Sequence, residues 1–262
     1  MSNKFCNSLW AGLLLLAPFL QADTISVYLS APSAQSTFFN GATTETWNEA
    51  TPGTYQTYAG TIGNYGVTGQ DSFVIQPADQ FGGANGSQYM AFGAQSGNAN
   101  PIQLVLTSPA TYFGFWFSAG DANNGISFYD GSTLVGRFST APILSSLQAP
   151  TVTAVDGATY QSSAYFGNPN NTSEDAGEPF AYVNFLVTGG HVTRIVFDNS
   201  GLTGTGFEND NQSVYNGVVT VAPTAVFVST LGAPEPATWA LWLGGLCVLA
   251  GFRRANVRKE VL

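Results

Sequence analysis

The stretch YFGFWFS, residues 112–118, is the clearest fold signal in the chain. Large apolar residues fill almost all of it, and Phe113, Phe115 and Phe117 occur at every second position. Successive side chains of a β-strand point to opposite faces, so these three rings would share one face. The stretch therefore predicts a strand whose phenylalanine face belongs to a core.

Similar short runs continue along the chain and are separated by Gly, Asn, Pro and Asp. In TRIVFDN (193–199), Ile195 and Phe197 would point one way while Arg194 and Asp198 point the other. No window outside the two terminal segments has the 3.6-residue period of an amphipathic helix. We expect an all-β domain, a two-sheet jelly-roll-like β-sandwich with a core rich in Phe and Tyr. Residues 140–161 fit either an edge strand or a short helix, and residues 167–179 read as a polar, acidic loop.

Charge is scarce and unevenly placed. Only 9% of the 262 residues are charged, and five of the 7 basic residues lie near the ends of the chain. Between Asp23 and Pro234, Arg137 and Arg194 face 14 acidic residues, a net charge of 2 − 14 = −12. Such a surface repels phosphate backbones, which excludes nucleic acid as a partner, whereas calcium or a basic partner is compatible with it.

The middle of the chain lacks the residues of several common catalytic centres. Cys6 and Cys247 both lie in apolar terminal segments, so the domain between them has no disulfide framework, thiolate zinc site or Cys nucleophile. His191 is the single histidine, and no G-x-S-x-G elbow accompanies it. We therefore assign no catalytic residue and expect a protein that is not an enzyme.

The N-terminus has the pattern of an export signal. Lys4 precedes the apolar run LWAGLLLLAPFL (9–20), and QAD follows it. A basic lead, a short apolar segment and a small residue at the cut site are typical of a secretory signal peptide. We expect a signal-peptide helix over 1–22, with cleavage after Ala22. A retained membrane anchor is the alternative.

The C-terminus combines three features in order. Pro234, Glu235 and Pro236 disfavour helix and leave an extended, accessible backbone. An uncharged run follows over about 237–252, and at 1.5 Å per residue it predicts a single transmembrane helix about 24 Å long. Arg253 and Arg254 come next and would remain cytoplasmic by the positive-inside rule. This orientation leaves the acidic domain outside the cytoplasm, in agreement with the signal peptide.

The stretch PEPATWALWLGGLCVLAGFRR (234–254) resembles the PEP-CTERM sorting signal of exosortase-dependent bacterial proteins. The resemblance implies export through the Sec translocon, a transient anchor in the inner membrane, and processing by an exosortase at a motif made of Pro234, Glu235, Pro236, Arg253 and Arg254. It further implies a final place on the cell surface, in the outer membrane or in an extracellular matrix. A plain tail anchor is the alternative. We expect a signal peptide (1–22), an extracytoplasmic β-sandwich (23–222), a linker (223–233) and the sorting signal (234–262).

A second resemblance covers roughly residues 88–211. The blocks QYMAF, YFGFWFSAGDANNGISFYDGSTLVGRF, YVNF, VTRIVFDNSG and GFENDN are similar, in the same order, to blocks of one group of exosortase-dependent surface proteins. The turn WFSAGDANNG departs from the group's usual pattern. This resemblance implies fold and sorting, and it implies no particular chemistry.

Oxygen-rich stretches suggest calcium as the one possible cofactor. DANNG (121–125) and ENDN (208–211) cluster carboxylates and amides, which are the ligands that calcium prefers. The candidate ligands are Asp121, Asn123, Asn124, Glu208 and Asp210. The alternative is that these side chains cap their own turns.

Two further kinds of site can be read from the residues. Trp47, Tyr55 and Trp116 are candidates for a platform that stacks against sugar rings, and packing in the core is the alternative. Carboxylate pairs could hydrolyse glycosides if suitably spaced. The pairs in question are Glu208 with Asp210, or members of the set Glu174, Asp175 and Glu178.

These observations favour a non-enzymatic secreted protein of the cell surface or extracellular matrix. The alternative is a carbohydrate-binding module that engages the exopolysaccharide of a biofilm matrix. A secreted glycoside hydrolase is a third possibility.

Overall fold

The computed structural model describes residues 23–69, 71–93, 96, 101–170, 174–199, 205–218 and 227–229. These residues belong to one compact unit, Asp23–Leu231. The expected signal peptide, transmembrane helix and sorting motif (Pro234, Glu235, Pro236, Arg253 and Arg254) lie outside the described residues. Within the described ranges, no helix combines the length and the hydropathy that a membrane crossing requires.

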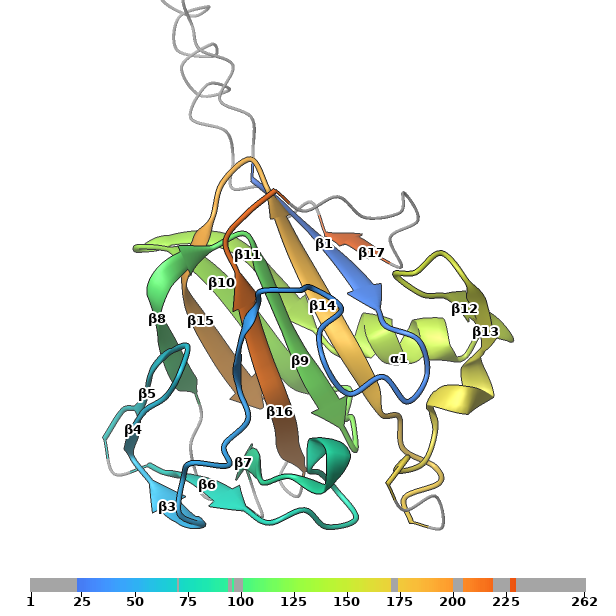
Figure 1. Ribbon diagram of the computed structural model, residues 1–262, viewed down its shortest axis with the longest axis horizontal. Helices are drawn as coiled ribbons and strands as arrows, with labels where there is room; N and C mark the ends of the chain where they lie inside the picture. The colour runs from blue at the N-terminus through green and yellow to red at the C-terminus, as the bar shows by residue number, and fades with distance from the viewer. Residues whose placement is uncertain are drawn as a thin grey trace, which may run out of the picture. The chain divides into compact units, whose positions relative to one another are not determined.

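Antiparallel β-sheets make up most of the described structure (Figure 1). The larger sheet has the order β17 (Phe227–Ser229), β1 (Thr24–Leu29), β14 (Ala181–Thr188), β9 (Tyr112–Ser118), β16 (Gly206–Tyr215), β7 (Tyr89–Gly93), β6 (Phe73–Gln76) and β3 (Gly53–Tyr55), with β2 (Thr43–Glu45) paired to β16. The smaller sheet has the order β11 (Thr133–Ser139), β10 (Asn124–Asp130), β15 (Val192–Asn199), β8 (Ile102–Ala110), β5 (Gly63–Val67) and β4 (Thr57–Ala59). Counted over the described residues, the sheets have nine and six strands.

The chain passes back and forth between the two sheets. It runs from β8 in the six-stranded sheet to β9 in the nine-stranded sheet, returns through β10 and β11, and then visits β14, β15 and β16 alternately. Figure 1 shows β14, β9 and β16 in front of β10, β15 and β8. The expected all-β class and two-sheet sandwich are therefore confirmed.

The phenylalanine face of β9 lies in the core between the sheets, as its alternation predicts. Phe113, Phe115 and Phe117 are fully buried. Phe115 stacks on Phe185 of the neighbouring strand β14 with ring centroids 6.1 Å apart. Phe113 crosses to the opposite sheet, where its centroid lies 6.0 Å from that of Phe128 in β10. Aromatic side chains from both sheets therefore fill one continuous core.

The outer face of the nine-stranded sheet is also covered, because every residue of β9 is buried. Tyr112 points outward and packs against Phe39, with centroids 4.4 Å apart, while its hydroxyl accepts a hydrogen bond from Thr37 Oγ1 at 2.9 Å. Trp116 points the same way and packs against Phe180 at 6.3 Å. The segment after β1, blue in Figure 1, crosses this face. Over the central strands of the six-stranded sheet, the described residues form no such cover on the outer face, and alternate residues of β8 are exposed.

Residues 140–161, which the sequence left open between helix and strand, contain both. Helix α1 (Ala141–Leu147) has Pro142 in its first turn and buries Ile143 and Leu147, which are four residues apart and so share one face. The hairpin β12 (Thr151–Thr153) and β13 (Thr159–Gln161) follows. Two short 3-10 helices, η1 (Ala84–Gly86) and η2 (Ser162–Tyr165), complete the described elements.

Strand β17 lies within the range 223–233 that was expected to be a linker. Its three residues pair with Ile25–Val27 of β1 and form the edge of the nine-stranded sheet. A short strand can dock here because β1 would otherwise leave its backbone groups unpaired on that side.

Candidate functional site

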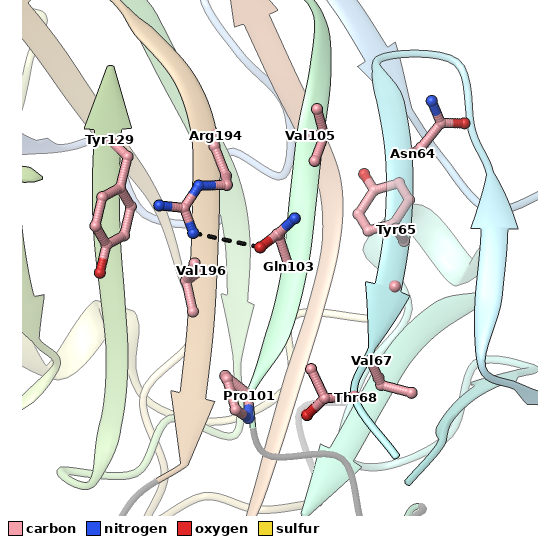
Figure 2. Close-up of a pocket in the computed structure, with 11 residues that line it drawn as sticks. Asn64, Tyr65, Val67, Thr68, Pro101, Gln103, Val105, Tyr129, Arg194 and Val196 are labelled. Atoms are coloured by element: carbon pink, nitrogen blue, oxygen red, sulfur yellow. Dashed lines mark hydrogen bonds between the residues drawn. The ribbon is translucent and has the colours of Figure 1, made fainter. Parts of the chain in front are cut away.

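A groove of about 480 Å³ runs over the exposed face of the six-stranded sheet. Two rows of side chains cross it from strand to strand. In the first row, Arg194 of β15 stands between Tyr129 of β10 and Val105 of β8, and Val105 pairs with Asn64 of β5. In the second row, Val196 pairs with Gln103, which pairs with Gly66. Figure 2 shows the first row side by side across four strands.

Arg194 is the central polar group of the groove. Its guanidinium carbon lies 3.8 Å from the centroid of the Tyr129 ring, a cation–π contact. Its Nη1 donates a hydrogen bond to Gln103 Oε1 at 3.3 Å (Figure 2). In the described part of the chain no carboxylate forms an ion pair with it, whereas Arg137 on the same sheet lies 3.3 Å from Asp198. Arg194 therefore keeps hydrogen-bond donors that can serve a ligand.

The lining of the groove suits binding more than acid–base chemistry. The described residues that line it are Asn64, Tyr65, Gly66, Val67, Thr68, Pro101, Gln103, Val105, Tyr129, Arg194 and Val196, and none of these is Asp, Glu, His or Cys. Amide and guanidinium groups alternate with apolar surface, and Val105 is 42% exposed. Such a surface offers hydrogen bonds and flat contact area together.

The candidate aromatic platform is wrong for its two tryptophans. Trp47 is fully buried and packs on Tyr65, with ring centroids 4.7 Å apart, while Trp116 is covered by Phe180. Tyr55 is half-buried and stacks on Phe73 at 5.9 Å. Burial of the tryptophan rings leaves no face for a sugar, so the core-packing alternative holds for both.

The five expected calcium ligands do not form one group. Asn124 is fully buried on the inward side of β10, in line with Ile126 and Phe128 of the core, and its side-chain amide has no hydrogen-bond partner. Glu208 lies on the outer face of the nine-stranded sheet, near enough to Asp121 for their negative charges to interact. Asn123 lies in the turn beside Asp121. Among the described residues, no three His, Cys, Asp or Glu side chains are close enough together to hold a metal as they stand.

Asp210 has a structural role. Its Oδ2 accepts hydrogen bonds from the Ala84 amide at 2.8 Å and from Ser87 Oγ at 2.6 Å, and its Oδ1 accepts one from the Asn211 amide at 2.6 Å. Burial raises the pKa of Asp210 to about 7, although these hydrogen bonds oppose the rise. The carboxylate is fully buried and fixes η1 onto β16, so it is inaccessible to a metal or a sugar.

Glu208 lies nearby on the same outward face of β16 and is 9% exposed. Burial raises its pKa to about 8, and the negative charges of Asp121, Glu178 and Asp79 add to the rise. Gly206 makes room for the carboxylate, because a Cβ at that position would lie 2.0 Å from Glu208 Oε1. Sequence reasoning found Asp121 and Glu208 but missed Asp79 and Glu178 as their neighbours.

Two other candidates, His191 and the pair Glu208 with Asp210, do not form a catalytic centre among the described residues. His191 Nε2 lies 3.3 Å from Asp130 Oδ1, with both side chains 44% exposed. Glu208 and Asp210 share a face, as expected, but the burial of Asp210 prevents this pair from flanking a glycosidic bond.

Comparisons with known proteins do not identify the chain. No protein-family model and no curated protein matches the sequence. Among solved structures, the chain is similar to the catalytic domain of a GH87 alpha-1,3-glucanase in complex with tetrasaccharides, with a TM-score of 0.34 and 13% identity. The match covers 73% of this chain, which spans 31% of the length of that structure. These comparisons assign no family, activity or ligand to the chain.

Proposed function

We propose that this chain is an exported, non-enzymatic protein of the cell surface or extracellular matrix, sorted by an exosortase, and that the exposed groove binds a polysaccharide strand. The sorting part rests on the resemblance of residues 234–254 to a PEP-CTERM signal. The binding part rests on the groove, above all on the guanidinium of Arg194 at its centre, which forms no ion pair with any described residue.

The strand order supports a binding module. One run of the nine-stranded sheet is β14-β9-β16-β7, and the facing run of the six-stranded sheet is β11-β10-β15-β8. Eight strands that alternate between two four-stranded runs in this way correspond to a jelly roll, an architecture that includes lectin domains. Fold alone does not assign function, so the proposal depends on the groove.

The chemistry of the groove favours a neutral, hydroxyl-rich polymer. Arg194, Gln103 and Asn64 carry donors and acceptors that fit sugar hydroxyls, and Val105 and Val196 offer flat apolar surface between them. A polyanion fits less well, because one arginine stands against a net charge of −12 over residues 23–234. The groove crosses several strands and is open, which suits an extended chain.

Affinity electrophoresis of the exported protein tests the proposal. We expect gels that contain a neutral polysaccharide, such as dextran or a β-glucan, to retard the protein. Arg194→Gln should reduce that retardation at least tenfold in apparent affinity. Arg137→Gln removes the same charge from the same sheet outside the groove and should behave as wild type. Failure of every neutral polysaccharide to retard the wild type, or equal retardation of the Arg194 variant, would overturn the binding role. Retardation by alginate alone would assign an acidic ligand instead.

The sorting role has its own test. Mass spectrometry of the mature protein should find a C-terminus near Pro234 in cells with an active exosortase and the intact tail in cells without one. Recovery of Arg253 and Arg254 in the exported protein of exosortase-positive cells would refute processing.

A further inference from the structure

Four carboxylates from distant parts of the sequence converge at one end of the nine-stranded sheet, on its outer side. They are Asp79 before η1, Asp121 between β9 and β10, Glu178 before β14, and Glu208 in β16; we call them the acidic cluster. Backbone hydrogen bonds join the segments that carry them: the Gly120 amide donates to Pro179 O at 3.1 Å. The acidic cluster is thus formed by tertiary contacts between separate segments, and no single stretch of sequence contains it.

No positive side chain balances the acidic cluster within the described residues. The basic side chains there are Arg137, Arg194 and His191. Arg137 pairs with Asp198, Arg194 lies over Tyr129, and His191 contacts Asp130, all on the six-stranded sheet or its turns. Charges that repel one another at a partly buried site need a cation or a proton to offset them.

Two buried oxygens, one in Glu178 itself and one in the neighbouring Ser118, have no hydrogen-bond partner among the described residues. Ser118 is fully buried, and its Oγ has no partner. Ser118 lies directly opposite Glu208 in the β9–β16 pairing, so both side chains project from the same face of the sheet. Glu178 Oε2 is also buried without a donor. Buried polar atoms are nearly always paired, so these two atoms point toward a missing ligand.

We infer that the acidic cluster binds a divalent cation of the calcium type, with Glu208, Glu178 and Asp121 as carboxylate ligands and Ser118 Oγ as a neutral one. Calcium accepts six to eight oxygen ligands at about 2.3–2.6 Å and tolerates irregular geometry, which suits ligands drawn from three loops and a strand. As they stand, no three of the described carboxylates lie close enough together to share an ion. Binding would draw the loop carboxylates toward Glu208, which β16 holds in place.

This ligand set differs from the one that the sequence suggested. Asp210 is excluded because three hydrogen bonds already satisfy it, and Asn124 because it faces the core. Glu178 enters because the fold brings residues 174–180 beside the β9–β10 turn.

Calcium titration of the chelator-treated exported protein at pH 8 tests the inference, with no polysaccharide present. Millimolar calcium should raise the melting temperature by about 5 °C, and terbium should give luminescence sensitised by Trp116, which lies two residues from Ser118. Magnesium should give a smaller shift because it requires stricter geometry.

Matched variants separate the site from general charge effects. Glu178→Gln lies in a loop and should fold, yet lose most of the calcium shift and the terbium signal. Glu49→Gln removes one exposed carboxylate elsewhere and should keep both. No calcium shift in the wild type, or an equal shift in the Glu178 and Glu49 variants, would overturn the inference and leave the polysaccharide groove unaffected.

Discussion

The stability of the metal-free protein should fall as pH rises, and Glu208 should account for a large part of the fall. Glu208 has a pKa of about 8 in the folded protein, against 4.5 for the unfolded chain. Below pH 4.5 the carboxyl group is neutral in both the folded and the unfolded chain, so its full contribution to stability is present. As pH rises from 4.5 to about 8, the unfolded chain loses this proton more readily than the folded protein does, and the free energy of unfolding falls. A difference of about 3.5 pH units corresponds to about 5 kcal/mol at 1.36 kcal/mol per unit, an upper figure because loops can relax around the charge.

Glu208→Gln isolates this effect, because glutamine imitates the protonated acid. At pH 5 the variant and the wild type should have similar free energies of unfolding in excess chelator. At pH 9 the variant should be the more stable by several kcal/mol. Asp210, with a folded pKa of about 7, changes in the same direction in both proteins and so cancels from the difference.

Urea denaturation at pH 5, 6, 7, 8 and 9, followed by tryptophan fluorescence, measures the difference, since Trp47 and Trp116 are buried. A constant gap between variant and wild type across this range, or a wild type that becomes more stable with rising pH, would refute the reasoning. Calcium should reverse the order at pH 9, because the cation stabilises the charged Glu208 that the variant lacks.

Three further changes test the packing and the hydrogen bonds of the fold. Phe115→Ala should lower the free energy of unfolding by about 3–5 kcal/mol, because it leaves a cavity in the aromatic core, and urea denaturation measures it. Glu45→Gln should cost about 1.5–3 kcal/mol by the same assay, because the buried carboxylate accepts hydrogen bonds from the Trp47 amide at 2.9 Å and the Thr61 amide at 2.6 Å. His191→Ala should shift the melting temperature by less than 2 °C, since its contact with Asp130 is exposed at the surface; a loss as large as that of Phe115→Ala would contradict this assignment.

Local alternation predicted the strands well where one face is buried. Phe113, Phe115 and Phe117 face the core, and Ile195 and Phe197 are buried while Arg194 and Asp198 point outward. These outcomes depend only on the two-residue period of a strand.

The alternation of residues along a strand could not predict the burial of Trp47 and Trp116. Trp116 lies on the outward side of β9, and the segments that carry Phe81, Ala84 and Phe180 make that side an interior. Trp47 adopts a positive φ of 58° just after β2 and is enclosed by Tyr58 and Tyr65. Both outcomes depend on loops that cover the sheet, and a local pattern carries no information about them.

The candidate sites show the same limit. The sequence indicated that Arg194 points outward, but the register that places it beside Tyr129 and Val105 is a property of three strands. The sequence selected Glu208 and Asp121, while Glu178 joins them only because its loop folds back over the end of the sheet. In both sites, contacts between residues far apart in the sequence determine which side chains are neighbours.

The pairing of β17 with β1 has a mechanical consequence. Ser229 lies beside Ile25, so the first and last strands of the described fold meet antiparallel, with their free ends on the same side. Tension applied between these two ends would break the hydrogen bonds between the strands one after another (unzipping). It would not load them all at once (shearing). The edge strand should therefore separate at low force while the other strands of the two sheets stay folded.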